Sequence, residues 1–435
     1  MRILHCNTHE SSGGAAIAAN RLHRGLLATG MESLLAVMAP AGETPQVALL
    51  GGRLSRRLLR PAAIYVEKKL PEALYSRPAR QTYATFSLLP SLQHRRINAI
   101  PKDILHLHWV GERLLDPWAL AGLQGPVVWT MHDAWPFTGG CHYPSAECGR
   151  HSERCGRCPE LGGRWERDLS RLHWLLKRRA IARIRPVMIA PSRAFAASAA
   201  KSGLLQGRRV EHIPNGIDAE IFRPLDKAQA RKLLGLPQND GILLFGAVNA
   251  AGDHRKGFDL LLQALGMLRA SGQQDFLPVV FGASGSDESL PYPARFLGRL
   301  HDNLTLALAY SAADIFVCPS RQDNLPNTVL ESLACGTPVA AFSVGGIPDM
   351  IDNGQNGYLA KAEDAADLAA GIALLLRDAD LRLRMGRLGR EKIEKEFSLP
   401  VIVRRHIALY EELLERITFK TPHSEQRRNR CCRHP

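Results

Sequence analysis

The sequence has no long apolar run, and this absence excludes the commonest kind of membrane protein. No stretch of about 18 consecutive apolar residues occurs, so no segment is predicted to span a bilayer as a helix. The opening stretch, MRILHCNTHE, enters a strand-like run directly and lacks the pattern of a secretory signal. Short-period repeats are absent as well. We therefore expect a cytoplasmic protein.

Acidic residues are also in short supply. The chain has 42 Asp and Glu against 56 Lys and Arg, a formal net charge of +14. This excess favours an anionic partner, but it does not choose among nucleic acid, acidic lipid and a phosphorylated substrate. At 435 residues the chain is too long for one ordinary core, so two domains of roughly 200 residues each are expected.

Short apolar strands alternate with amphipathic helices along the chain. The strands show no alternation of polar and apolar residues, as expected where helices cover both faces of a parallel sheet. We predict an α/β fold with two Rossmann-like doubly wound domains, separated near residues 214–226, where Asn-Gly and Pro cluster. The predicted strands lie within 2–6, 33–38, 104–110, 126–133 and 186–192, and then 241–247, 276–284, 313–320 and 337–343.

Two acids stand out in PSRQDNLPNTVLESLACGTPVAAFSVGGIPDMI, residues 319–351. Asn324 is a good helix cap, Asp323 lies in the loop before the helix, and Glu331 lies about 8 Å along its axis. Free N–H groups at the helix start would favour phosphate. The spacing suits an elongated ligand such as a nucleotide-diphosphate sugar. A capped surface helix with ordinary acids explains the same residues.

Three further stretches carry weaker signals. HRKGFDLLLQAL, residues 254–265, puts Lys256 just before an amphipathic helix, where an ammonium can meet phosphate. Gly13 and Gly14 in SSGGAAIAAN allow close backbone approach to a ligand at a helix N-terminus, although the full G-x-G-x-x-G pattern is absent. His132 follows a buried strand, at the end where α/β folds place ligands. A lone histidine there is also commonly structural.

Together these stretches resemble the retaining GT-B glycosyltransferases of the large group 1 family, which includes sucrose synthases and many bacterial polysaccharide enzymes. The resemblance implies that Asp323 contacts the transferred sugar and Glu331 the nucleotide ribose. The sequence departs from the family's usual pattern in having Asp323 for Glu and Leu325-Pro326 for Phe-Gly. The same short stretch, residues 320–326, is similar to that of a colanic-acid or exopolysaccharide-type branch of the family.

The resemblance also implies roles for the weaker stretches. Lys256, assisted by Arg255, would bind the diphosphate, and His132 would contact the transferred sugar. The catalytic group is thus predicted to comprise His132, Asp323, Arg255 and Lys256. The donor-binding group is predicted to comprise Gly13, Gly14, Arg255, Lys256, Asn324, Leu325 and Glu331. No cofactor is required for catalysis under this hypothesis.

The predicted architecture has an acceptor-side domain over 1–220 and a nucleotide-sugar-binding domain over 221–395, facing across a cleft. A terminal helix over 396–420 crosses back to the first domain, and 421–435 form a disordered basic tail. The predicted reaction transfers a sugar, with retention of configuration, from a nucleotide-sugar donor to a saccharide acceptor in polysaccharide assembly, with a lipid-linked acceptor favoured. Alternatives are a sugar-nucleotide epimerase or hydrolase on the same fold and a zinc-containing nucleic-acid-binding protein. Under the favoured reading nucleic acid is not a partner.

Two segments fall outside this scheme. Residues 51–98 mix basic residues with Leu, Tyr and Phe; they are either a solvated insertion or a surface that docks peripherally on the inner face of the cytoplasmic membrane. Cys141, Cys148, Cys155 and Cys158 end in a C-x-x-C pair. In a cytosolic protein they are either ligands of one structural zinc ion or incidental thiols in a loop.

Overall fold

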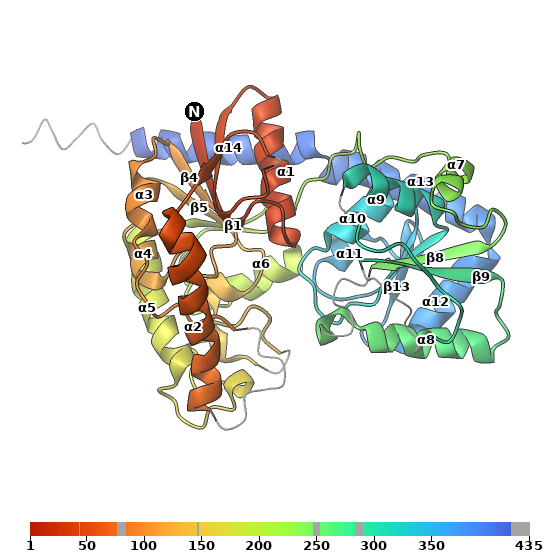
Figure 1. Ribbon diagram of the computed structural model, residues 1–435, viewed down its shortest axis with the longest axis horizontal. Helices are drawn as coiled ribbons and strands as arrows, with labels where there is room; N and C mark the ends of the chain where they lie inside the picture. Colours follow the sequence, from red (N-terminus) through yellow and green to blue (C-terminus); the bar gives the residue numbers. More distant parts are fainter. Residues whose placement is uncertain are drawn as a thin grey trace, which may run out of the picture. The chain divides into compact units, whose positions relative to one another are not determined.

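The computed structural model describes residues 1–42, 44–75, 84–145, 148–246, 253–282, 290–300 and 302–418. The chain forms two compact units (Figure 1). The first comprises Met1–Ala190, Ala196–Ile213 and Ile402–Pro435, and the second Pro191–Phe195 and Pro214–Val401. The main boundary between these units follows residue 213, and the return to the first unit follows residue 401. The predicted disordered tail, 421–435, lies outside the described residues.

The first unit is built on a parallel sheet of seven strands in the order β3-β2-β1-β4-β5-β6-β7. Side chains of the central strands β4, β5 and β6 are fully buried, which explains their unbroken apolar runs. The strands are β1 Arg2–His9, β2 Glu32–Ala39, β3 Val47–Leu49, β4 Ile104–Leu107, β5 Val127–Thr130, β6 Val187–Ala190 and β7 Val210–His212. The helices are α1 Gly14–Ala28, α2 Arg60–Leu74, α3 Gln93–Ala99, α4 Pro117–Ala121, α5 Leu169–Ile184, α6 Arg193–Ala200 and α14 Leu399–Thr418; a π-helical turn, Ser55–Leu59, leads into α2.

The second unit repeats the plan with a six-stranded parallel sheet in the order β10-β9-β8-β11-β12-β13. Alternate residues of β8 enter different cores: Ile242 and Leu244 pack on one face, and Leu243 and Phe245 on the other. The strands are β8 Gly241–Gly246, β9 Phe276–Phe281, β10 Arg295–Phe296, β11 Ile315–Cys318, β12 Val339–Phe342 and β13 Gly357–Ala360. The helices are α7 Lys227–Leu233, α8 Phe258–Ala270, α9 Asn303–Ala312, α10 Asn327–Ala334, α11 Ile347–Met350, α12 Ala365–Arg377 and α13 Ala379–Lys392.

The prediction of two doubly wound α/β domains is confirmed, and each of the nine predicted strand regions contains a strand. Four strands were missed: β3, β7, β10 and β13. They have two to four residues each, and their side chains are only partly buried, whereas the predicted four-residue strands are buried throughout. Within the described ranges, no helix has both the length and the apolar character needed to cross a membrane.

In each unit the strand order reverses at one point. In the first unit this switch point lies between β1 and β4, and in the second between β8 and β11. Open α/β sheets bind ligands beyond the carboxyl ends of the strands at such a point. The residues that follow these four strands are therefore the first place to look for a site.

Candidate functional site

At the switch point of the second unit, Lys256 follows β8 and Asp323 follows β11. Their side chains meet: the Lys256 Nζ donates to Asp323 Oδ2 at 2.7 Å. The Asp323 side chain is 13% exposed and that of Lys256 is 42% exposed. Two residues that the sequence singled out independently, 67 positions apart, thus form one charged pair with its cationic end open to solvent.

Glycines hold the two loops of this pair in place. Gly257 has φ +65°, and a Cβ atom there would overlap the carbonyl oxygen of Pro319. Gly345 has φ +53°, and a Cβ atom there would overlap the carbonyl oxygen of Asp323. Both positions need glycine for its backbone conformation and for the close approach of two backbones. Gly345 was not among the predicted site residues, although the doubled glycine after a buried strand was a visible signal.

The start of α10 differs from the prediction. Pro326 occupies the N-cap position with no side-chain cap, and the helix begins at Asn327. Asn324 does not cap it; its Oδ1 accepts a hydrogen bond from the Ser192 hydroxyl at 3.0 Å. Pro326 has no side chain that could cap the helix, and its carbonyl accepts a hydrogen bond from the Val329 N–H at 3.1 Å.

Glu331 lies inside α10, as predicted, and is 3% exposed. Its Oε2 accepts a hydrogen bond from the Tyr310 hydroxyl at 3.0 Å, which fixes the orientation of the carboxylate. Leu325 is 5% exposed and belongs to the apolar core, so only its backbone can serve a ligand. The Arg255 guanidinium pairs with Asp253 at 2.6 Å, which partly satisfies its charge.

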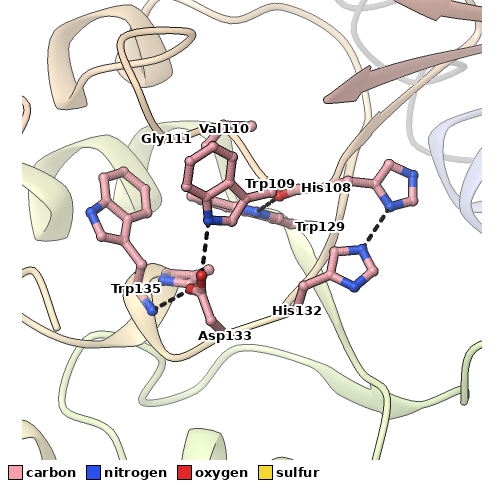
Figure 2. Close-up of a pocket in the computed structure, with 9 residues that line it drawn as sticks. His108, Trp109, Val110, Gly111, Trp129, His132, Asp133 and Trp135 are labelled. Carbon is pink, nitrogen blue, oxygen red and sulfur yellow. Dashed lines mark hydrogen bonds between the residues drawn. The ribbon is translucent and has the colours of Figure 1, made fainter. Parts of the chain in front are cut away.

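At the switch point of the first unit, the glycine loop and His132 are both present. Gly13, with φ +90°, occupies the N-cap position of α1, and Gly14 begins the helix. No atom lies within 4 Å of a Cβ built on Gly13, so the backbone is open there. His132 follows β5 and lines a pocket with His108, Trp109, Val110, Gly111, Trp129, Asp133, Trp135 and Pro136 (Figure 2).

Asp133 is the buried anchor of this pocket. It accepts hydrogen bonds from the Trp109 indole at 2.9 Å and the Trp135 backbone N–H at 2.9 Å, and its Oδ2 lies 2.6 Å from His142 Nδ1 (Figure 2 shows the first two). Burial acts to raise the pKa of Asp133, but attraction to His142 and these hydrogen bonds outweigh it and hold that pKa below its usual range. Asp133 is therefore an ionised, fixed group that shapes the loop after β5.

His132 has a different electrostatic environment from Asp133. Burial lowers the pKa of His132 to about 4, with partial compensation by Asp133. His132 is therefore neutral at physiological pH, and its Nε2 lies 3.1 Å from His108 Nδ1. His108 was missed at the sequence level. The alternation HLH at the end of β4, which places His106 and His108 on one face, was the available signal.

The four cysteines lie in the loop between β5 and α5. Cys141, Cys155 and Cys158 are buried and Cys148 is half-buried. The Cys141 thiol is hydrogen-bonded to Cys158, and Cys155 Sγ accepts from the Gly139 N–H at 3.1 Å. Burial raises the pKa of Cys155 to about 12. Among the described residues, no three of these sulfurs lie within 4.8 Å of one another, so the donors suit zinc but are not gathered around one point.

A buried cation lies near these thiols. Lys177 on α5 is fully buried, donates to the Trp135 carbonyl and lies 4.1 Å from the centroid of the Trp135 ring. Burial lowers the pKa of Lys177 to about 7, with some compensation from Cys155, Cys141 and Asp133. A buried ammonium is costly without a nearby negative charge.

Two family models match the chain. A model described as "Glycosyltransferase Family 4" matches residues 12–221, and one described as "Glycosyl transferases group 1" matches residues 240–378. Both switch-point sites lie within these matches.

Individual proteins that match the chain are also described as glycosyltransferases. A D-inositol 3-phosphate glycosyltransferase from Thermobispora bispora is 34% identical over 234 residues, covering 49% of this chain and 53% of the relative. A protein of the same description from Geodermatophilus obscurus is 32% identical over 224 residues, covering 47% and 49%. The chain spans about half the length of these curated relatives.

Solved structures match over nearly the whole chain. Sucrose-phosphate synthase from Thermosynechococcus elongatus matches with a TM-score of 0.66 and 21% identity, covering 95% of this chain and 99% of that one. Anabaena HepE in complex with UDP-glucose matches with a TM-score of 0.64 and 16% identity, covering 95% and 100%. At such identities the comparison establishes the fold, which is GT-B as predicted.

Proposed function

Because the two glycosyltransferase family models match residues 12–221 and 240–378, we propose that the chain is a glycosyltransferase that transfers a sugar from a nucleotide-diphosphate sugar to an acceptor hydroxyl. The observation that carries this proposal is the Lys256–Asp323 pair at the switch point of the second unit. An ammonium suits a diphosphate, and a carboxylate beside it suits the hydroxyls of the attached sugar. Glu331, held by Tyr310, would accept hydrogen bonds from the ribose.

The chemistry of this site is electrostatic. As the bond to the sugar breaks, negative charge grows on the departing diphosphate, and the Lys256 ammonium would stabilise it. Arg255 would act mainly through Asp253, with which it is paired. We propose that transfer proceeds with retention, by front-face attack of the acceptor hydroxyl, with the leaving phosphate as the base. No cofactor is needed for this step.

Two classes of acceptor come into question. The curated relatives are described as acting on D-inositol 3-phosphate, whereas the sequence resembles an exopolysaccharide-type branch. The names of the relatives do not support that branch, so it remains a prediction. An exposed surface of the first unit favours it, because a lipid-linked saccharide would require the enzyme to reach a membrane.

That surface is the outer side of α2 and the preceding turn. Arg60 pairs with Glu112, and Glu67 with Arg113, both at 2.8 Å, so one side of the helix is anchored to the unit. The other side carries apolar side chains that are 55–65% exposed, accompanied by basic residues. These apolar residues are Leu54, Leu58, Leu59, Tyr65 and Val66. We propose that this side docks on an anionic bilayer.

The function can be tested in two stages. First, thermal shift against UDP-, GDP- and ADP-sugars should reveal one donor that stabilises the protein, by about 2.7 kcal/mol at a hundredfold excess over its Kd. Second, release of the nucleoside diphosphate should require an acceptor, with inositol 3-phosphate and a lipid-linked saccharide as the two arms. Release without any acceptor would indicate a hydrolase or epimerase. Failure of every donor to stabilise the protein would refute the proposal.

A further inference from the structure

One face of the sheet in the first unit is lined with buried histidines. His5 on β1 and His106 on β4 are register partners in adjacent parallel strands, so their side chains point to the same face. His108 lies two residues beyond His106 and continues along that face. Rings of His5, His106 and His108 lie 4.2–5.3 Å apart between centroids. His132, which follows β5, stacks on His108 at 5.4 Å.

Three of these histidines form a hydrogen-bonded chain that ends at the candidate site. His5 Nδ1 lies 3.0 Å from His108 Nε2, and His108 Nδ1 lies 3.1 Å from His132 Nε2. Both ring nitrogens of His108 are thus engaged, one toward each neighbour. Figure 2 shows the second of these bonds at the edge of the pocket. His132 is the only member of this chain of three that also belongs to the predicted site.

A metal ion is the obvious alternative explanation. In the part of the chain that the structure describes, His5, His106 and His108 form the one group with three potential ligand atoms within 4.8 Å of one another. Five of their six ring nitrogens already have hydrogen-bond partners, however. His106 lies 2.7 Å from the Tyr410 hydroxyl and 2.8 Å from the Thr130 hydroxyl, and the chain itself accounts for three more nitrogens. Hydrogen bonds thus account for five of the six nitrogens without a metal ion.

The chain has a direction, because its members are neutral. Burial lowers the pKa of His5 and His108 well below the ordinary value and that of His132 to about 4. A neutral imidazole donates at one nitrogen and accepts at the other. Within a chain of such rings, the tautomer of one member dictates that of the next.

The buried end of the chain selects the direction. His5 Nε2 is buried, and the described residues offer it no hydrogen-bond partner. If it carried the proton, a buried N–H would be orphaned, which is rarer in proteins than an unused acceptor. The favoured arrangement has His5 Nδ1–H donating to His108 Nε2 and His108 Nδ1–H donating to His132 Nε2. His132 then carries its proton on Nδ1.

We propose that His108 is a positioning residue that fixes both the orientation and the tautomer of His132, so that His132 presents an N–H donor at Nδ1. This inference rests on the proposed function for its consequence, because a donor at this position would bind a sugar oxygen. The tautomer itself is a property of the ligand-free protein. It can therefore be tested whether or not the transfer reaction is confirmed.

Two substitutions of His108 form a matched pair. Asparagine places its amide nitrogen near the position of Nδ1, so His108→Asn can still donate to His132. Glutamine places its amide near the position of Nε2, so His108→Gln keeps contact with His5 and loses His132. Both are neutral and polar, so both should disturb folding about equally. His406→Leu is the control: His406 lies against His106 with its rings 5.7 Å apart, but its Nδ1 bonds to the Ile402 carbonyl, outside the chain.

The first measurement is the ¹⁵N shift pattern of His132 in protein labelled at histidine, assigned with a His132→Gln variant. The wild type, His108→Asn and His406→Leu should show a protonated Nδ1 and a bare Nε2. His108→Gln should show a mixture of tautomers. A protonated Nε2 at His132 in the wild type, or the same pattern in the Asn and Gln variants, would overturn the proposal.

The second measurement is turnover with the donor found by thermal shift. His108→Gln should lower kcat about tenfold, the effect of one misplaced hydrogen bond, with donor KM within about twofold. His108→Asn should recover most of this loss. Equal losses in both variants, or a comparable loss in His406→Leu, would mean that the histidines act only through packing.

Discussion

Replacing Asp323 by asparagine should separate the binding of the nucleotide from the transfer of the sugar. The substitution keeps the shape of the side chain and removes the charge that faces Lys256 at 2.7 Å. Under the proposed function, the wild-type ammonium would be shared between Asp323 and an incoming diphosphate, and the carboxylate would also repel that diphosphate. Without the charge, Lys256 is available to the phosphates alone.

The size of the effect follows from the exposure of the pair. Because the Lys256 side chain is 42% exposed, its attraction to Asp323 is screened, and a pair of this kind contributes about 1 kcal/mol. Asp323→Asn should therefore tighten the binding of free nucleoside diphosphate by up to about fivefold. Turnover should fall about ten- to a hundredfold, because a charge-assisted hydrogen bond to the sugar, worth about 1.5–3 kcal/mol, is lost.

Isothermal titration calorimetry with the nucleoside diphosphate and with the intact donor measures both effects. Lys256→Met is the matched control and should weaken both ligands by at least about tenfold. The double variant should bind free nucleotide no better than Lys256→Met alone, since the benefit of removing Asp323 depends largely on the lysine. If Asp323→Asn weakens free nucleotide as much as Lys256→Met does, Asp323 serves to orient the lysine and the sugar assignment is wrong.

Three further predictions concern other parts of the chain. Glu331→Ala should weaken nucleotide binding by roughly ten- to a hundredfold with an unchanged melting temperature, and an unchanged dissociation constant would remove the ribose assignment. Flotation should recover the protein with anionic vesicles and less of it with neutral ones. Leu58→Glu with Leu59→Glu should abolish recovery, whereas Leu383→Glu on α13, at a leucine that is more exposed than either, should not; equal recovery with both lipids would count against docking. We also propose that the four loop cysteines bind one structural zinc ion and that their thiolates offset the charge of the buried lysine on α5. Elemental analysis should find about one equivalent of zinc, and changing the C-x-x-C pair to serine should remove it. Metal-free protein with the same melting temperature would refute this.

Much of the fold was predictable because its central strands are buried on both faces. The runs at β8 and β9 are apolar without interruption, and helices must then cover both sides of the sheet. Asp323 and Lys256 could be singled out because each lies in a recognisable break between a strand and a helix, and Glu331 because it follows Asp323 within the next helix. The sequence could not reveal that Lys256 and Asp323 form an ion pair.

The errors arose where tertiary contacts override local preference. Asn324 is a favourable cap in isolation, but Ser192, 132 residues away, occupies its side chain and Pro326 takes the cap position. Leu325 was predicted to bind the donor; its side chain is buried in the apolar core, so the prediction now concerns its backbone alone. The histidine chain joins residues 24 and 103 positions apart, and only the strand order brings them together.

The glycines at 257 and 345 have a consequence for engineering. Each is a point where two backbones touch without an intervening side chain, so even alanine would push apart the loops that carry the ion pair. In a mutational scan both positions would score like catalytic residues although neither carries a reactive group. A library designed to change donor preference should leave both glycines fixed and vary the side chains on either side. The loops keep their spacing only while no side chain stands at these two backbone contacts.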